Sequence, residues 1–272
     1  MLFYAIIWYN ISMADYVLAR KSRNIISSIL HVILNILLGV GSIVITFITR
    51  SWIPGVSLVL ISKWRIFAVR PRYWGINILS SLVDLIVGVS FVIIAYCSGT
   101  TWLVIHTVLA ALYTLWLIIL KPRSSELAAE IQSLVAVFLG SMATTMLFAS
   151  SNSVLMSIIC FFIGFAASRH LLVQSDDNEY GRLTYTCGLV TAELAWLCNS
   201  WLIVYTFGST GILVPQLSIL LTIFAFVSGR IYKSSIKHEG KINMSEVATP
   251  LIFSSLVVIT LVIWFSNPIF DV

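Results

Sequence analysis

Charged residues are scarce in this chain. Of its 272 residues, only 10% are Asp, Glu, Lys or Arg, whereas 59% are hydrophobic, and the mean hydropathy is +1.01. A soluble globular domain carries charge on about a quarter of its residues. No polar stretch in this chain is long enough to hold a core of its own. The composition therefore excludes a soluble protein and gives no sign of a separate soluble domain.

Sequence motifs of soluble catalysis are also missing. The chain has no H-E-x-x-H, no G-x-S-x-G and no phosphate loop, which are motifs that carry defined chemistry. Its four cysteines form neither a C-x-x-C pair nor a metal-ligand spacing, and each lies in or beside an apolar run, where a free cysteine acts as a small buried hydrophobe. We therefore expect no cofactor and no metal, and we lean against an enzyme.

Long apolar runs are what the chain does contain. A helix needs about 20 apolar residues to cross the hydrocarbon core of a bilayer, and the runs predict an all-α, polytopic transmembrane bundle of nine spans. The predicted spans are 25–48, 51–69, 76–98, 101–120, 127–149, 152–173, 183–207, 212–232 and 246–265. Within span 152–173, Gly164-Phe165-Ala166-Ala167-Ser168 is a small-xxx-small element of the kind that packs two membrane helices closely.

The second of these spans is short. Residues 52–62 are apolar for only eleven positions, about 16 Å of helix, so a re-entrant hairpin is the alternative. A hairpin would place the basic residues that follow it outside the membrane and would invert every later loop. We therefore interpret 51–69 as a short span whose Lys63 and Arg65 reach back to the inner interface.

The placement of basic residues sets the expected orientation. With nine spans, every one of the 16 Lys and Arg residues except Arg50 falls on or near one side. Basic loops stay in the cytoplasm, which predicts a plasma (inner) membrane protein with a cytoplasmic N-terminal basic cluster and an external C-terminus. The same bias accounts for the net charge of +5, so we expect no nucleic-acid partner. His106 falls near the outer interface and is expected to be solvated.

Residues 1–24 form the first of two predicted regions, and residues 25–272 form the bundle. Residues 1–19 have no basic segment ahead of their apolar part and no evident cleavage site, unlike a standard signal peptide. Asn10 and Asp15 weaken a spanning interpretation, so we favour an interfacial helix, with a tenth span as the alternative.

A collar of basic and aromatic residues precedes the third span. Such clusters attract anionic lipid headgroups, so the predicted partners are the bilayer and its anionic lipids, besides unknown membrane proteins. The expected headgroup contacts are Lys63, Trp64, Arg65, Arg70, Arg72 and Trp74.

Two acids fall inside predicted spans. Counting 1.5 Å per residue from the start of each span, Asp84 lies about 12 Å deep and Glu193 about 15 Å deep. Intramembrane acids are costly and are candidates for ion or substrate sites. His31 and Asn35, four residues apart, share a helical face at a similar depth. We predict one polar site formed by Asp84, Glu193, His31 and Asn35, with few salt-bridge partners at that depth.

Two resemblances extend these inferences. The segments Ile61-Ser62-Lys63-Trp64-Arg65, Val83-Asp84 and Ala192-Glu193-Leu194-Ala195-Trp196 resemble uncharacterised multispanning proteins of reduced-genome bacteria, a likeness that implies a class and no mechanism. Arg70-Pro71-Arg72-Tyr73-Trp74 with Asp176-Asp177-Asn178-Glu179 is similar to intramembrane prenyltransferases, although the first acidic motif of those enzymes has no match here.

Three functions therefore remain open. The first is a carrier or channel for a small solute or ion, with the buried acids in its path. The second is a structural or lipid-interacting membrane component that partners envelope proteins, and the third is a prenyltransferase-like enzyme. A cavity that reaches the acids favours the first function, and a closely packed interior favours the second.

Overall fold

The computed structural model describes six stretches of the chain, namely residues 28–99, 103–148, 153–173, 180–200, 203–206 and 212–264. The predicted N-terminal region 1–24 and the acidic loop 176–179 lie outside the described residues.

Helices make up nearly all of the described chain, as the apolar runs predict. The first is Ser28–Thr49. It is followed by α2 (Trp52–Ile61), α3 (Trp74–Cys97), α4 (Leu103–Leu115), α5 (Glu126–Phe148), α6 (Ser153–Leu172), α7 (Tyr180–Asn199), α8 (Gln216–Lys237) and α9 (Met244–Trp264). Short 3₁₀ turns η1 (Trp64–Ile66) and η2 (Pro71–Tyr73) precede α3, and the π-helix η3 (Trp116–Leu120) continues α4.

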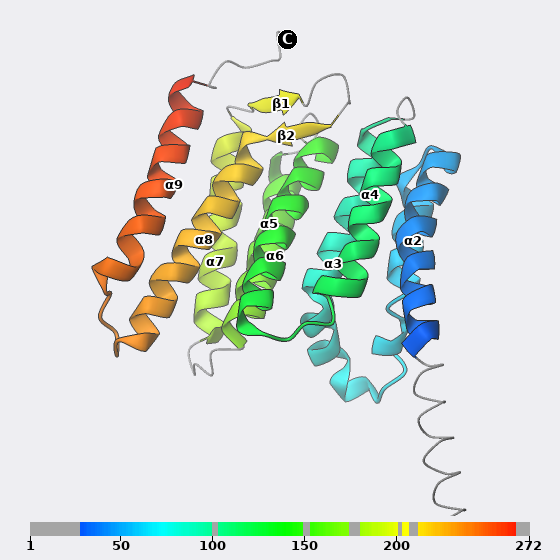
Figure 1. Ribbon diagram of the computed structural model, residues 1–272, viewed down its shortest axis with the longest axis horizontal. Coiled ribbons are helices and arrows are strands. Elements are labelled where there is room, and N and C mark those ends of the chain that lie inside the picture. Colours follow the sequence, from blue (N-terminus) through cyan, green and yellow to red (C-terminus); the bar gives the residue numbers. More distant parts are fainter. Residues whose placement is uncertain are drawn as a thin grey trace, which may run out of the picture.

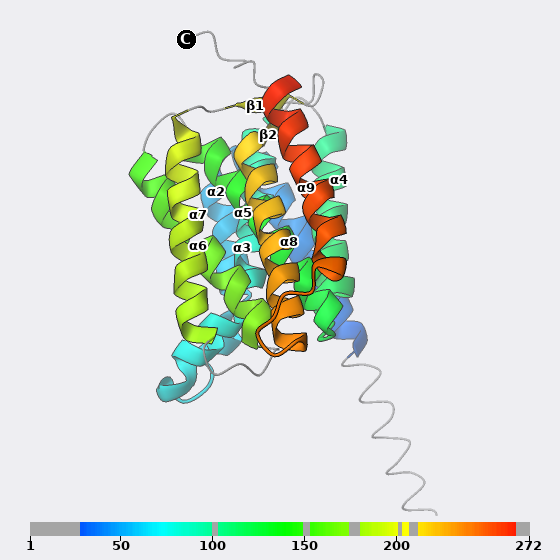
Figure 2. The same ribbon diagram turned by 90° about the vertical axis from the view of Figure 1, so that its left-hand side faces the viewer.

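These helices form one bundle in which neighbours run alternately up and down (Figure 1). α9 stands at one edge, and the Ser28–Thr49 helix with α2 stands at the other. In the view turned by 90°, α6 and α7 lie to one side of α8, and α4 and α9 lie to the other (Figure 2). Seven of the described helices are long and apolar enough to cross a membrane, so this is a multi-pass membrane protein.

Two of the nine predicted spans do not meet this standard. α2 has only 10 residues. α7 has 20 residues, but Arg182, Glu193 and several threonines make it too polar to be counted among the seven. The prediction that span 183–207 is one helix is wrong, because α7 ends at Asn199 and the chain continues into a strand.

That strand belongs to a small hairpin at one end of the bundle. β1 (Val204–Thr206) pairs with β2 (Leu213–Pro215) in antiparallel register, with Val204 opposite Pro215. Pro215 then serves as the N-cap of α8 in extended backbone geometry. Proline cannot donate to a ladder and its ring fixes φ, so it suits the end of a strand and the start of a helix.

The short α2 packs against the Ser28–Thr49 helix that precedes it. Gly55 lets α2 pack directly on the Ser28–Thr49 helix, because a Cβ there would lie 2.2 Å from Thr46 Oγ1 and 2.9 Å from the Ser42 carbonyl oxygen. Lys63, just after α2, lines the same cavity as His31, which is in the first turn of that helix. The chain between Arg50 and Lys63 therefore returns to the end of the bundle at which the Ser28–Thr49 helix begins.

Packing is concentrated along α3, α5 and α6. One buried cluster joins α3 and α4 through side chains such as Val87, Phe91 and Tyr113, and a second joins α5, α6 and α8 through Val137, Met156 and Leu221. The outward surfaces remain apolar. Leu37 is 61% exposed, for example, and Phe253 is 68% exposed, as expected where lipid rather than water surrounds the helices.

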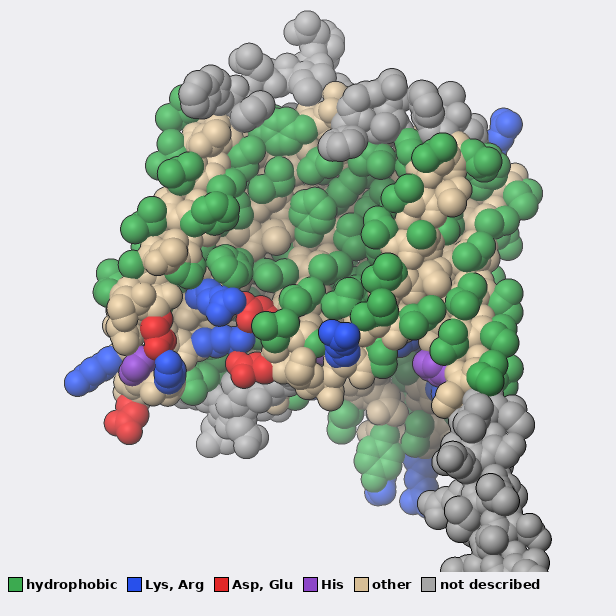
Figure 3. All heavy atoms as spheres, viewed as in Figure 1, with side chains coloured by type: hydrophobic (Ala, Val, Ile, Leu, Met, Phe, Trp, Pro, Cys, Tyr) green, Lys and Arg blue, Asp and Glu red, His purple; other side chains and the backbone are tan. Residues whose placement is uncertain are grey.

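Charged side chains gather at one end of this apolar surface (Figure 3). We call it the basic end. It contains the start of the Ser28–Thr49 helix, the segment from Lys63 to Tyr73, and the ends of η3 and α8 with Lys121 and Lys237. The hairpin β1–β2 lies at the other end (Figure 1).

Candidate functional site

A polar cavity of about 590 Å³ opens at the basic end. It is enclosed by the Ser28–Thr49 helix, the segment from Ser62 to Ile66, α3, η3, α5 and α6. The polar side chains that line it are His31, Asn35, Ser62, Lys63, Arg65, Ser80, Ser81, Asp84, Trp116, Lys121, Gln132 and His170. Residues that lie far apart in the sequence therefore meet at one polar site.

Asp84 is the centre of this site. Lys63 Nζ donates a hydrogen bond to Asp84 Oδ2 and forms an ion pair with it. Lys121 Nζ lies 2.8 Å from the same oxygen, and Trp116 Nε1 donates to Oδ1 at 3.1 Å. The carboxylate side chain is only 14% exposed. Charge-assisted hydrogen bonds to a nearly buried carboxylate are among the stronger polar contacts in proteins.

The π-helix η3 explains how Trp116 and Lys121 reach the same carboxylate. Five residues along an α-helix turn a side chain by about 140° away from its starting direction. In η3 the backbone N–H of Lys121 instead donates to the Trp116 carbonyl at 2.9 Å, five residues back, which closes a wider turn. This wider turn brings residues 116 and 121 toward the same side of the helix. Single π turns of this kind are frequent at functional sites.

The expectation of few salt-bridge partners for Asp84 is wrong, and the predicted depth is the reason. α3 begins at Trp74, and its side chains remain largely exposed until Val83, the first buried residue of the helix. The chain between α2 and α3 projects beyond the neighbouring helix ends (Figure 1). Asp84 therefore lies level with Lys121 at the end of η3, where lysines from the helix ends can reach it.

His31 and Asn35 lie where the four-residue spacing predicts, on one wall of the same cavity. Their side chains are in contact, with Asn35 Nδ2 at 3.2 Å from His31 Nδ1. Asn35 is buried, with 8% exposure. The structure thus brings three of the four predicted site residues, Asp84, His31 and Asn35, to one cavity.

Glu193 does not join them. It is exposed on α7 and is not among the residues that line the cavity. α7 packs mainly against α6, so its polar positions have no route to α3. The helical spacing of Glu193 indicated its depth in the membrane but not which neighbour its helix would have.

Sequence reasoning missed a second part of the cavity, formed by Gln132 and His170. His170 Nε2 lies 2.7 Å from Gln132 Oε1. The Gln132 amide also donates to the carbonyl oxygens of Leu120 and Arg123, so it fastens α5 to the end of η3. Gln132 is one of the few amides inside an apolar run, and that was the available sign.

The charges of the cavity do not balance. Lys63, Lys121 and Arg65 contribute three cations, whereas Asp84 is the only acid among the described residues that line it. Burial lowers the pKa of the Lys63 ammonium from its ordinary value, an effect that Asp84 opposes and Lys121 reinforces. Two ammonium groups on one carboxylate leave an excess of positive charge, which attracts a further anion.

A second ionic cluster, also missed, joins α5 to α8. Lys233 Nζ lies 2.8 Å from Glu130 Oε2 and 3.1 Å from Glu126 Oε1, and Arg230 lies 3.2 Å from Glu130 Oε1. Glu126 and Glu130 are four residues apart on the first turns of α5, so their shared face could have been read from the sequence. Two acids face two bases here, and this cluster has no charge excess.

The collar is divided by the fold. Lys63 turns inward to Asp84 and is only 12% exposed, so its predicted lipid contact is replaced by an ion pair. Trp64, Arg70, Arg72 and Trp74 are exposed. The Trp74 indole donates to the Val69 carbonyl at 2.9 Å, which holds the projecting segment in place.

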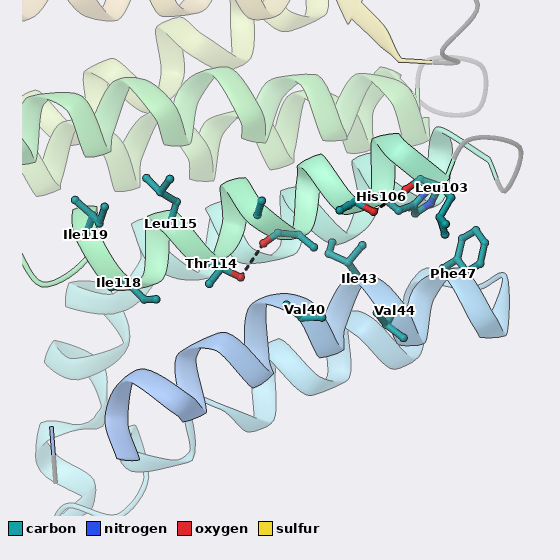
Figure 4. Close-up of a pocket in the computed structure, with 13 residues that line it drawn as sticks. Val40, Ile43, Val44, Phe47, Leu103, His106, Thr114, Leu115, Ile118 and Ile119 are labelled. Atoms are coloured by element: carbon teal, nitrogen blue, oxygen red, sulfur yellow. Dashed lines mark hydrogen bonds between the residues drawn. The ribbon is translucent and has the colours of Figure 1, made fainter. Parts of the chain in front are cut away.

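A second large cavity, of about 560 Å³, lies between the Ser28–Thr49 helix and α4 (Figure 4). Its labelled side chains are mostly aliphatic, and the Thr114 hydroxyl is already bonded to the Ala110 carbonyl at 2.7 Å. His106, expected to be solvated, lines this cavity with only 6% exposure and bonds the Ala95 carbonyl at 3.0 Å. A cavity this apolar suits hydrocarbon rather than a polar solute.

Metal ligands do not cluster in the described part of the chain, where no group of three His, Cys, Asp or Glu residues could hold an ion. Among the cysteines, Cys160 is buried, and the other three are partly buried. Comparison with known proteins gives no relative on which to base a function: no family model, no curated protein and no solved structure matches this chain.

Proposed function

We propose that this protein is a membrane carrier or channel for a small anionic solute, and that the solute binds in the Asp84 cavity. The observation that supports the proposal is the combination of a polar cavity of about 590 Å³ with three cationic side chains and one acid. Such a volume is in the range of small-molecule sites. A purely structural ion pair would need neither the space nor the extra positive charge.

An anion fits the donor groups better than a cation does. Lys63 and Lys121 can donate several hydrogen bonds and accept none, and the same holds for Arg65. The Asp84 carboxylate is already held by two ammonium groups and an indole N–H. A cation would have to displace these donors, whereas an oxyanion such as a carboxylate or a phosphate can bind the same ammonium groups.

The proposal includes the topology. We infer nine crossings, with the basic end in the cytoplasm of a plasma membrane, because basic loops are retained there. α2 and α7, which are respectively too short and too polar to qualify alone, are then sheltered crossings. α2 packs against the first helix and α3 through Gly55, and α7 packs against α6 through Gly164. α9 runs away from the basic end, which places its Trp264 end outside.

An uptake assay tests this function. Purified protein is reconstituted into zwitterionic liposomes, and uptake of labelled formate, phosphate and sulfate is compared with uptake into empty liposomes. Lys121→Gln should lower the uptake rate of the transported anion about tenfold or more, since a hydrogen bond to a charged group contributes about 1.5–3 kcal/mol. Lys237→Gln is the matched control, because Lys237 lies at the same end but pairs with Glu246 outside the cavity.

Three results decide the outcome. Equal rates for the two lysine variants, or no uptake of any anion above empty liposomes, would refute the proposal. Adding an anionic lipid distinguishes the source of the anion. If a lipid headgroup is the natural occupant of the cavity, anionic lipid will compete and lower the uptake of the free anion.

The exposed collar favours a second function, a lipid-interacting membrane component. Trp64 is 63% exposed, and Phe67 is 54% exposed. Arg70 and Arg72 are exposed on the same projecting segment. Aromatic and basic side chains in this mixture suit the headgroup layer. Binding to vesicles of defined composition, described below, tests this function separately from transport.

A further inference from the structure

We propose that Asp84 couples anion binding to proton uptake, so that the cavity takes up about one proton with each anion. This inference rests on the proposed function and goes beyond it, because it names a coupling ion and the residue that carries it. The argument depends on which groups already occupy the two lysines of the cavity.

Asp84 acts as an internal anion at the place where an external one would bind. Both Lys63 and Lys121 direct their ammonium groups to the same oxygen of Asp84. Lys63 is only 12% exposed. A solute anion therefore meets the Asp84 carboxylate when it approaches the Lys63 ammonium. A solute anion that binds these ammonium groups must displace Asp84 or lie directly beside it.

The incoming anion and the Asp84 carboxylate compete for the same ammonium groups. Carboxylates a few ångströms apart repel strongly, and where cations do not compensate both of them, one group retains a proton. Asp84 is the member of the pair that is fixed in the protein and only 14% exposed. When the incoming anion takes over the ammonium groups, Asp84 loses the cations that kept it ionised. Its carboxylate then binds a proton, and the charge of the occupied cavity is unchanged by the arrival of one anion and one proton.

The other groups around Asp84 are less well placed to take up this proton. The cavity is also lined by side chains from the other elements around it. They are His31 of the Ser28–Thr49 helix, Arg65 of η1, Trp116 and Lys121 at η3, Gln132 of α5 and His170 of α6. Tyr113 of α4 lies near enough to feel the Asp84 charge. His170 is bonded to Gln132 and His31 to Asn35. Among the described residues, Asp84 is the acid in direct contact with both ammonium groups.

Calorimetry tests the coupling without requiring transport. The wild-type protein in zwitterionic nanodiscs is titrated with methanesulfonate, a strong-acid anion that cannot carry the proton itself. Repeating the titration in buffers of different ionisation enthalpy gives the number of protons taken up per anion. We expect about one proton for the wild type, and a dissociation constant that rises about tenfold for each pH unit above neutrality, the slope of a one-proton linkage.

The variants separate this inference from the proposed function. Asp84→Asn should bind methanesulfonate with no proton uptake and no pH slope. Lys121→Gln should bind it about tenfold or more weakly yet still take up the proton, because Lys63 and Asp84 remain. If Asp84→Asn fails to fold, the proton uptake of the wild type and of Lys121→Gln still tests the coupling. Glu246→Gln, at an ion pair outside the cavity, should behave as the wild type.

The possible failures differ. Binding by the wild type with no proton uptake would overturn the coupling and leave anion binding intact. Uptake of a proton that persists in Asp84→Asn would show that another group carries it and would also overturn the inference. Absence of any methanesulfonate, formate, phosphate or sulfate binding would overturn the proposed function itself.

Discussion

The ion pairs of Asp84 predict how three substitutions rank by the stability that each one removes. Removing one partner of a fully buried ion pair costs about 3–5 kcal/mol, whereas an exposed pair contributes about 0–1 kcal/mol. Asp84 and Lys63 are 14% and 12% exposed, and Lys121 is 35% exposed. The Asp84–Lys63 pair should therefore lie near the buried limit and the Asp84–Lys121 pair between the two limits.

Substitution by neutral side chains of similar size keeps the packing and removes only the charge. We expect Asp84→Asn to lower the free energy of unfolding by about 3 kcal/mol, because it leaves two ammonium groups without a counter-charge. Lys63→Gln should cost about 2–3 kcal/mol, and Lys121→Gln, whose ammonium is better solvated, about 1 kcal/mol. The double variant Asp84→Asn/Lys63→Gln should cost at least about 1 kcal/mol less than the sum of its parts, as contacting residues do.

Equilibrium unfolding in mixed detergent micelles, followed by tryptophan fluorescence, measures these differences. Glu246→Gln is the control, because that residue forms an exposed pair at the same end and should change stability little. Equal losses for Lys63→Gln and Lys121→Gln would contradict the reasoning, as would additive losses in the double variant. Either result would mean that burial does not set the strength of these pairs.

Three further predictions concern the rest of the molecule. Gly164→Ala should destabilise the protein by about 1–3 kcal/mol, the range for overpacking, because a Cβ there would lie 2.0 Å from Thr191 Oγ1. Gly75→Ala is the control in the same unfolding assay, because a Cβ at Gly75 meets nothing within 4 Å. Equal effects of the two substitutions would contradict the contact. Replacing Arg70 and Arg72 together by Gln should weaken binding to vesicles containing phosphatidylglycerol by about 1 kcal/mol per residue and leave binding to zwitterionic vesicles unchanged; Lys63→Gln should not weaken it, since Lys63 faces Asp84. Reporter fusions after Ser150 and Gly208 should be external and those after Arg123, Arg182 and Lys237 cytoplasmic, whereas an external reporter within residues 63–74 beside a cytoplasmic one at Lys21 would disprove the topology.

Some site residues could be predicted because their relation is local. His31 and Asn35 share a face through the four-residue period of a helix, and the structure keeps them in contact. The element beginning at Gly164 packs closely against Thr191 of α7, as small-xxx-small spacing predicts. The pairing of Lys63 with Asp84 was not predictable in this way. It spans 21 residues of sequence, two 3₁₀ turns and a change of helix direction.

Hydropathy by itself determined the membrane class, the helical architecture and most helix bounds, because an apolar run in lipid must satisfy its own backbone hydrogen bonds. Hydropathy could not determine how deep Asp84 lies in the bundle, because the apolar run of α3 starts two turns before neighbouring helices cover it. Only the tertiary structure decided which acid lies in a cavity. The π turn of η3 and the packing of α2 set Lys63, Lys121 and Trp116 around Asp84, while the pairing of α7 with α6 left Glu193 on the outside. The sequence shows which residues share a helix face, but only the packing of the helices shows which faces contact each other.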